Sequence, residues 1–128
     1  MQFIAVIIAA IASFGFGAIW YMSLAKPWMA AAGVSEEQVK AGAGPAPYII
    51  AFISAILVAG MMRHIFASSG IDTGGKGLIS GLGIGLFMAS PWLATCYSFG
   101  MRSRKLIAID TGYITFGSAI MGLILGLF

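Results

Sequence analysis

The sequence QFIAVIIAAIASFGFGAIWYMSL, residues 2–24, contains no acidic or basic side chain. A helix needs about 20 mostly apolar residues to cross about 30 Å of hydrocarbon, where lipid offers no partners to non-helical backbone. No Lys or Arg precedes the apolar run, and the run is longer than the core of a secretory signal. The stretch therefore predicts a membrane-spanning helix.

The composition of the whole chain agrees with this prediction. Of the 128 residues, 60% are hydrophobic and 9% are charged, and the mean hydropathy is +1.00. A soluble domain carries about 25% charged residues, so this chain cannot cover a water-facing surface. We expect the lipid bilayer as its partner and the bacterial inner (plasma) membrane as its location. The net charge of +3 lies in the loops, which argues against a nucleic-acid partner.

Three further segments satisfy the same length rule, at residues 48–66, 77–97 and 107–128. Together with residues 2–24 they predict an all-α fold, a four-helix transmembrane bundle that forms one domain over residues 1–128. The loop between the first two spans is the longest and the most polar. Ser35 and Gln38 in this loop match a capping box, which predicts that a short helix begins there.

Basic residues are distributed unevenly between the loops. The first and third loops share one side of the membrane and hold five of them (Lys26, Lys40, Arg102, Arg104 and Lys105), whereas Arg63 and Lys76 lie near the other side. By the positive-inside rule the first and third loops face the cytoplasm and both termini face outward.

Small residues recur at four-residue spacing in every expected span. The stripes include Ala5, Ala9, Ser13 and Gly17; Ala51, Ala55 and Ala59; Thr73, Gly77, Gly81, Gly85 and Ala89; and Ser118, Gly122 and Gly126. Such stripes let helix backbones approach closely. We favour packing inside one chain, with pore lining or contact between protomers as the alternative. Four short helices enclose little volume, so a homo-oligomer is expected.

The aromatic residues suggest a site. All three Trp and all four Tyr lie in or near the half of the membrane that holds the first and third loops: Trp20, Trp28, Trp92, Tyr21, Tyr48, Tyr97 and Tyr113. An anchoring belt normally occurs at both interfaces. A one-sided belt and an aromatic vestibule open to the cytoplasm are the two interpretations. Tyr21 shares the stripe of Gly17, so we expect its ring to point inward, toward Trp92, Tyr113 and Asp110.

Asp110 lies five residues after Lys105, which is about 7.5 Å along a helix. It either N-caps the fourth helix or faces the bundle interior as an ion or proton site, with Tyr113 one turn away and Arg102 or Arg104 as candidate partners. The candidate ligand-binding residues are Trp20, Tyr21, Trp92, Asp110 and Tyr113.

The remaining polar groups favour structural roles and no catalysis. Arg63 and His64 are expected to end the second helix and complement its dipole, and Cys96 is expected to be a packing residue. One His, one Cys and four acids cannot supply a metal site or an activated nucleophile. We therefore expect no enzyme, no metal and no cofactor.

Three segments resemble one family: GAIWYMSLAKPWM from Gly17 to Met29, GVSEEQVK after it, and LIAIDTGYITFGSAIMGLILG from Leu106 to Gly126. They are similar to the domain-of-unknown-function family numbered 1761, small four-span membrane proteins, over nearly the whole chain. The most specific residues are Gly17, Trp20, Tyr21, Trp28, Asp110, Gly112 and Tyr113. The chain departs from the family pattern at Gln2, where Asn is frequent, and at Ile114, where His is frequent. The resemblance supports the fold, marks the same Trp, Tyr and Asp residues, and implies no particular activity.

Two classes of function fit these observations. The first is a small oligomeric transporter or channel in which the aromatic residues and Asp110 recognise a small solute or an ion, since aromatic faces attract cations. The second is a non-catalytic membrane subunit or partner protein that acts through its small-residue stripes.

Overall fold

The structure is a computed structural model that describes residues 2–42 and 44–128, and these residues form helices and no strand. The helices are α1 (Gln2–Ser23), α2 (Ala25–Ala32), α3 (Glu36–Ala41), α4 (Ala46–Ser69), α5 (Gly74–Gly83), the π-helix η1 (Ile84–Ala89), α6 (Ser90–Phe99) and α7 (Arg104–Leu127). Four segments are long and apolar enough to cross a membrane: α1, α4, the continuous run Gly74–Phe99, and α7. The all-helical fold with four long apolar helices is confirmed, and each expected span differs from its helix by a few residues at most.

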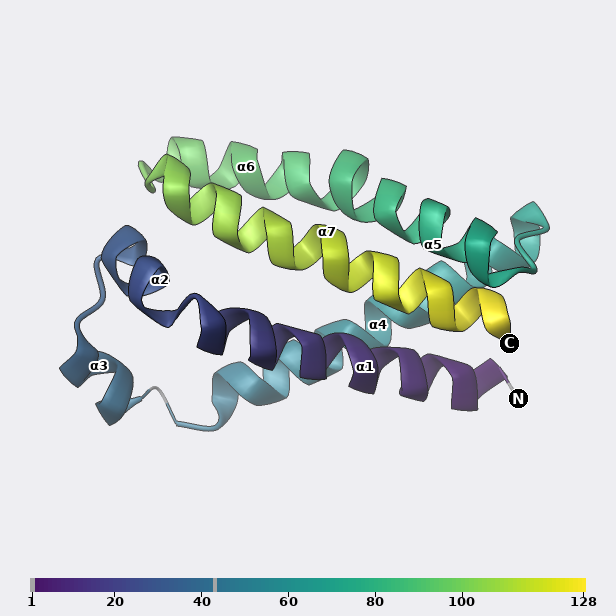
Figure 1. Ribbon diagram of the computed structural model, residues 1–128, viewed down its shortest axis with the longest axis horizontal. Coiled ribbons are helices and arrows are strands. Elements are labelled where there is room, and N and C mark those ends of the chain that lie inside the picture. Colours follow the sequence, from purple (N-terminus) through teal and green to yellow (C-terminus); the bar gives the residue numbers. More distant parts are fainter. Residues whose placement is uncertain (1, 43) are drawn as a thin grey trace.

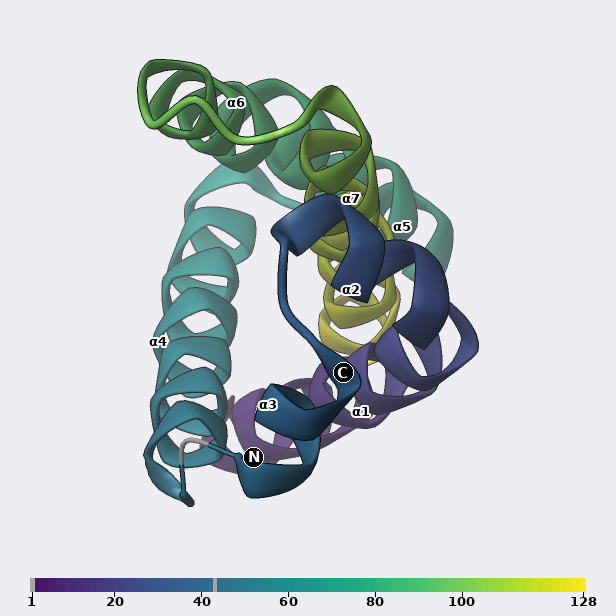
Figure 2. The same ribbon diagram turned by 90° about the vertical axis from the view of Figure 1, so that its left-hand side faces the viewer.

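The long helices run in alternating directions, so both chain termini lie at one end of the bundle (Figure 1). We call this the terminal end (residues 2–6, 63–76 and 122–128). The opposite, aromatic end (residues 20–42, 44–48 and 92–113) carries α2, α3 and the turn between α6 and α7. Viewed from that end, α2 lies across the start of α7 (Figure 2).

Helix α7 is the central element, because it contacts every other long helix. Small residues dominate its buried face, which includes Gly117, Ser118, Ala119, Gly122 and Gly126. The whole small-residue stripe of α1 is also buried: Ala5, Ala9, Ser13 and Gly17. Larger side chains fill the space between α1, α4 and α7, where Met62 and Phe66 are almost fully buried.

Helices α5 and α7 approach most closely, through glycine on both sides. A Cβ atom on Gly77 would collide with the carbonyl oxygen of Gly122, and one on Gly81 with the carbonyl oxygen of Ser118. A Cβ atom on Gly85 would lie 2.8 Å from the Ile114 carbonyl oxygen. The glycine stripe therefore packs inside the chain, where van der Waals contact between backbones joins helices in lipid.

The prediction for one residue of this stripe is wrong. Ala89 was expected to continue the row of Gly77, Gly81 and Gly85, but it is exposed, and Ser90 is buried in its place. The cause is the π-helix, in which the Ser90 N–H donates to the Gly85 carbonyl five residues earlier. Pro91 favours this widening, because its ring has no N–H and would clash with the carbonyl four residues before it.

Other local expectations had mixed outcomes. The capping box is confirmed: the Gln38 N–H donates to Ser35 Oγ at 3.1 Å, and the Ser35 N–H donates to Gln38 Oε1 at 2.8 Å. Cys96 was expected to be a packing residue, but it is exposed.

Arg63 and His64 were expected to end the second helix, and this is wrong. Helix α4 continues to Ser69, so neither residue lies in its last turn. Arg63 instead complements the end of a different helix, because its Nη1 donates to the Leu125 carbonyl oxygen of α7 at 3.2 Å.

Candidate functional site

Asp110 does not cap α7. The helix begins at Arg104, and Ser103 is its N-cap, with Oγ accepting the Leu106 N–H at 3.1 Å. Asp110 therefore lies about 9 Å inside the helix, and it is only 8% exposed. The capping interpretation is wrong, and the carboxylate faces the interior of the bundle.

Two tyrosines hold the buried carboxylate. The Tyr21 hydroxyl donates to Oδ1 of Asp110 at 2.6 Å, and the Tyr97 hydroxyl donates to Oδ2 at 2.8 Å. The three residues come from α1, α6 and α7. Hydrogen bonds to an ionised carboxylate are short and about twice as strong as neutral ones. The carboxylate thus connects three of the four spans.

Trp20 and Tyr21 both reach α7, although they are neighbours in the sequence. The Trp20 Nε1–H donates to the Ile109 carbonyl oxygen at 3.0 Å, and its ring lies on Gly112. A Cβ atom on Gly112 would come within 2.7 Å of Cζ2 of this ring. Gly112 therefore makes room for Trp20 beside the carboxylate.

Tyr113 completes the aromatic wall. Its ring centroid lies 5.4 Å from that of Tyr21, and a Cβ atom on Gly17 would lie 2.6 Å from its Cε1 atom. The ring of Trp28, from α2, meets Tyr21 edge-on at 6.4 Å. Counting Trp20 and Tyr97, five rings from four helices form the aromatic cluster that includes Asp110.

Helix α2 is attached to the turn that precedes α7. The Ser103 hydroxyl donates to the Ala31 carbonyl oxygen at 2.9 Å, and Arg102 Nη2 donates to the Ala32 carbonyl oxygen at 3.3 Å. These bonds use carbonyls that the end of α2 leaves unpaired. They hold Trp28 against Tyr21 at the aromatic end.

The structure brings together four of the five candidate ligand-binding residues: Trp20, Tyr21, Asp110 and Tyr113. It does not bring in Trp92, which is 75% exposed. It adds Tyr97, which was not among the candidates. The signal for Tyr97 was its place in the one-sided aromatic set. The face of the helix on which Tyr97 lies could not be derived from four-residue spacing, because η1 adds one residue between the glycine stripe and Tyr97.

The carboxylate has no basic partner within the described parts of the chain. The ion pairs found there join Lys40 to Glu36 and Lys76 to Asp72, both on the surface. Two cavities in these parts lie at the terminal end, away from Asp110. The aromatic end is a packed cluster around a carboxylate whose only observed donors are phenols.

The family described as "Protein of unknown function (DUF1761)" matches residues 4–126. The chain belongs to this family. The family expected from the sequence is thereby confirmed, and the match covers nearly the whole chain. No match was found among curated proteins or among solved structures.

Proposed function

We propose that this membrane protein is a small transporter in which Asp110 exchanges a proton or a small cation. The observation that supports the proposal is a carboxylate buried in a membrane-spanning helix, bound by two tyrosines from different helices and by no basic side chain in the described residues. Ionisable residues in such helices mark ion and proton pathways by default.

The electrostatics of the site favour exchange. A carboxylate at the centre of a spanning helix costs about 2.5 to 3.5 kcal/mol on insertion scales. Asp110, about 9 Å inside α7, bears a smaller cost, and the two phenol donors offset part of it. They leave the negative charge itself unneutralised. A proton or a cation would neutralise it, so the site favours binding of positive charge.

The path to the site would pass Tyr97. Asp110 is buried, whereas Tyr97 is only partly buried, near the end of α6. When the carboxylate binds a proton, its new O–H can donate to one tyrosine, whose hydroxyl can rotate from donor to acceptor, while the carboxyl oxygens keep the capacity to accept from the other tyrosine. A cation would displace one hydroxyl and meet the faces of the surrounding rings, which attract positive charge by about 0.5 to 2 kcal/mol.

The alternative, a non-catalytic subunit that binds partners through its glycine stripes, has less support. Within the chain, Gly77 and Gly81 of α5 already pack against α7, and Gly122 of α7 packs against α5. A second helix could reach them only if α5 and α7 separated.

We also propose that the chain acts as a homo-oligomer in the bacterial inner membrane. Four helices enclose little volume, and α7 fills most of the space between the others. A path for a solute larger than a proton would need walls from a second copy. Mass measurement in detergent, corrected for bound detergent, tests this, and a monodisperse monomer would contradict it.

The transport proposal is tested with protons as the probe. The purified chain is reconstituted in liposomes that contain a pH-sensitive dye, and a potassium gradient with valinomycin sets the membrane potential. We expect potential-driven proton uptake for the wild type and its loss for Asp110→Asn. Asp72→Asn is the matched control, because it makes the same change at an exposed carboxylate, and it should retain uptake. A sodium gradient in the same assay tests whether the chain exchanges sodium ions for protons.

Two results would count against transport at Asp110. Equal fluxes for wild type, Asp110→Asn and empty liposomes would remove the transport activity for both probes. Equal fluxes for wild type and Asp110→Asn, both above those of empty liposomes, would leave transport but exclude this carboxylate.

A further inference from the structure

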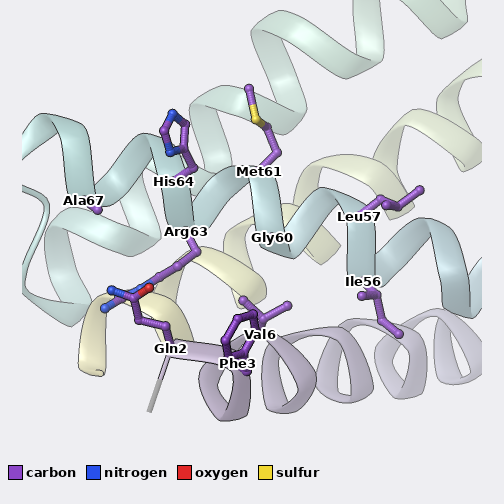
Figure 3. A pocket seen from close by; sticks show the side chains of 10 residues that line it. All are labelled: Gln2, Phe3, Val6, Ile56, Leu57, Gly60, Met61, Arg63, His64 and Ala67. Atoms are coloured by element: carbon purple, nitrogen blue, oxygen red, sulfur yellow. The ribbon is translucent and has the colours of Figure 1, made fainter.

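The terminal end holds a second polar feature that the proposed function does not use. A cavity of about 640 Å³ lies between the start of α1 and α4 (Figure 3). Its polar side chains are Gln2, Arg63 and His64. Its apolar wall includes Val6, Ile56 and Leu57. The volume lies in the range of about 300 to 1,000 Å³ that is usual for ligand pockets.

The guanidinium group of Arg63 is incompletely paired. Its Nη1 donates to the Leu125 carbonyl oxygen, but its Nε is buried and has no hydrogen-bond partner in residues 2–42 and 44–128. A buried donor without an acceptor costs about 1 to 3 kcal/mol. Arg offers a planar fork of donors that fits carboxylate and phosphate groups. Arg63 lines the cavity, so the part of this fork that the cavity reaches is suited to bind an anion.

The charges around the cavity favour the same ligand. Arg63 lines it, and none of the described residues around it is acidic. Asp72 lines a smaller cavity of about 220 Å³ on another side of Arg63, and its Oδ1 pairs with Lys76 Nζ at 3.4 Å. The larger cavity thus has a positive electrostatic character without an opposing carboxylate.

The rest of the cavity is suited to an acyl chain. Leu57 and Met61 on its wall are 68% and 60% exposed, and they belong to a helix that is long and apolar enough to span the membrane. Gly60 lies on the same wall, and a Cβ atom there would meet no other atom within 4 Å. From Arg63 to Ile56 the helix rises about 10 Å, against about 15 Å for one leaflet of hydrocarbon.

We propose that this cavity binds an anionic phospholipid, with its phosphate at Arg63 and one acyl chain along Gly60 and Leu57. A free anion would not use the apolar wall, and a zwitterionic lipid would bring its own cation to Arg63. This lipid site is independent of transport at Asp110.

The test measures lipid binding to the full chain in neutral detergent by native mass spectrometry. Phosphatidylglycerol is compared with phosphatidylcholine that has the same acyl chains, and with glycerol phosphate, which lacks them. We expect phosphatidylglycerol to bind at least tenfold more tightly than phosphatidylcholine. Glycerol phosphate at the same concentration should not displace it.

Two variants alter the two halves of the site. Arg63→Gln should reduce phosphatidylglycerol binding to the phosphatidylcholine level, and Gly60→Leu should weaken it by filling the path of the acyl chain. Gly60→Leu tests the site even if Arg63→Gln fails to fold, because its Cβ atom enters open space.

Matched controls separate this site from general attraction. Lys76→Gln removes an exposed basic charge at the same end, and Gly15→Leu adds the same side chain at an open glycine of α1 outside the cavity. Both should bind phosphatidylglycerol as the wild type does. Unchanged binding in Arg63→Gln or Gly60→Leu, equal binding of the two lipids, or displacement by glycerol phosphate would each overturn the proposal.

Discussion

Tyr97 and Tyr21 each satisfy one oxygen of Asp110, so removal of either hydroxyl should leave a buried acceptor without its donor. We predict that Tyr97→Phe lowers the free energy of unfolding by about 1 to 3 kcal/mol. Reversible unfolding in mixed detergent measures this change. Tyr48→Phe is the matched control, because Tyr48 is 68% exposed, and it should have little effect. Equal stability of the two variants would mean that the Tyr97 bond contributes nothing measurable.

Gly112 is important because of the ring that lies on it. An added Cβ atom would come within 2.7 Å of Trp20, whereas at Gly15 it would meet nothing within 4 Å. Overpacking typically costs about 1 to 3 kcal/mol, and replacement of an open helical Gly by Ala is favourable by about 1 kcal/mol. We predict that Gly112→Ala destabilises the chain and Gly15→Ala stabilises it in the same unfolding assay. Stabilisation by Gly112→Ala as large as that by Gly15→Ala would exclude the close contact between Trp20 and α7.

The sequence predicts part of this residue-scale arrangement. Tyr21 follows Gly17 by four positions, so helix periodicity alone placed its ring on the buried face of α1. The partner of that ring depends on how α1 and α7 are rotated against each other, which periodicity does not give. Trp92 illustrates the difference, because its place at the same end of the bundle did not put it in the cluster.

At the scale of the elements, the π-helix η1 determines which face of α6 meets α7. The buried positions before it are spaced by four residues, and the step from Gly85 to Ser90 is five. After this step Ser90 Oγ lies 3.1 Å from Thr115 Oγ1, and Tyr97 reaches Asp110. Hydropathy predicted the span but not the extra residue, because both helix types bury apolar side chains equally well.

Deletion of one residue within η1 should therefore be tolerated. Phe87 is 76% exposed. Without it, the run Gly74–Phe99 could form a regular α-helix in which the buried residues before and after the deletion still face α7. Deletion of Ile79, which is 72% exposed within α5, should instead rotate Gly77 away from Gly81 by about 100°. We predict near-wild-type thermal stability for the first deletion and loss of folding for the second, by circular dichroism in detergent. Equal damage from both would show that η1 is required in itself.

At the scale of the whole molecule, two charged side chains of opposite sign lie at the two ends of α7. The aromatic end buries the Asp110 carboxylate, and the terminal end holds the Arg63 guanidinium against α7. Helix α7 thus carries a negative side chain near its start, and a positive side chain from α4 contacts it near its end. A cation at the end of α7 is what the helix dipole favours there, and the contacts of both groups orient α7 relative to α1, α4 and α6.

The direction of the bundle in the membrane follows from the loops. Both termini lie at one end (Figure 1), and the loops of the aromatic end hold Lys40 and Arg104, part of the larger group of basic residues. We predict that the aromatic end faces the cytoplasm, because positively charged loops are retained there. Single cysteines at Lys40 and Lys76, both exposed, are introduced into a Cys96→Ala background, since Cys96 is itself exposed. An impermeant maleimide added to intact cells should label Lys76→Cys, and it should label Lys40→Cys only after the cells are opened. Labelling of Lys40→Cys in intact cells would reverse the orientation and place the path past Tyr97 on the outer side of the membrane.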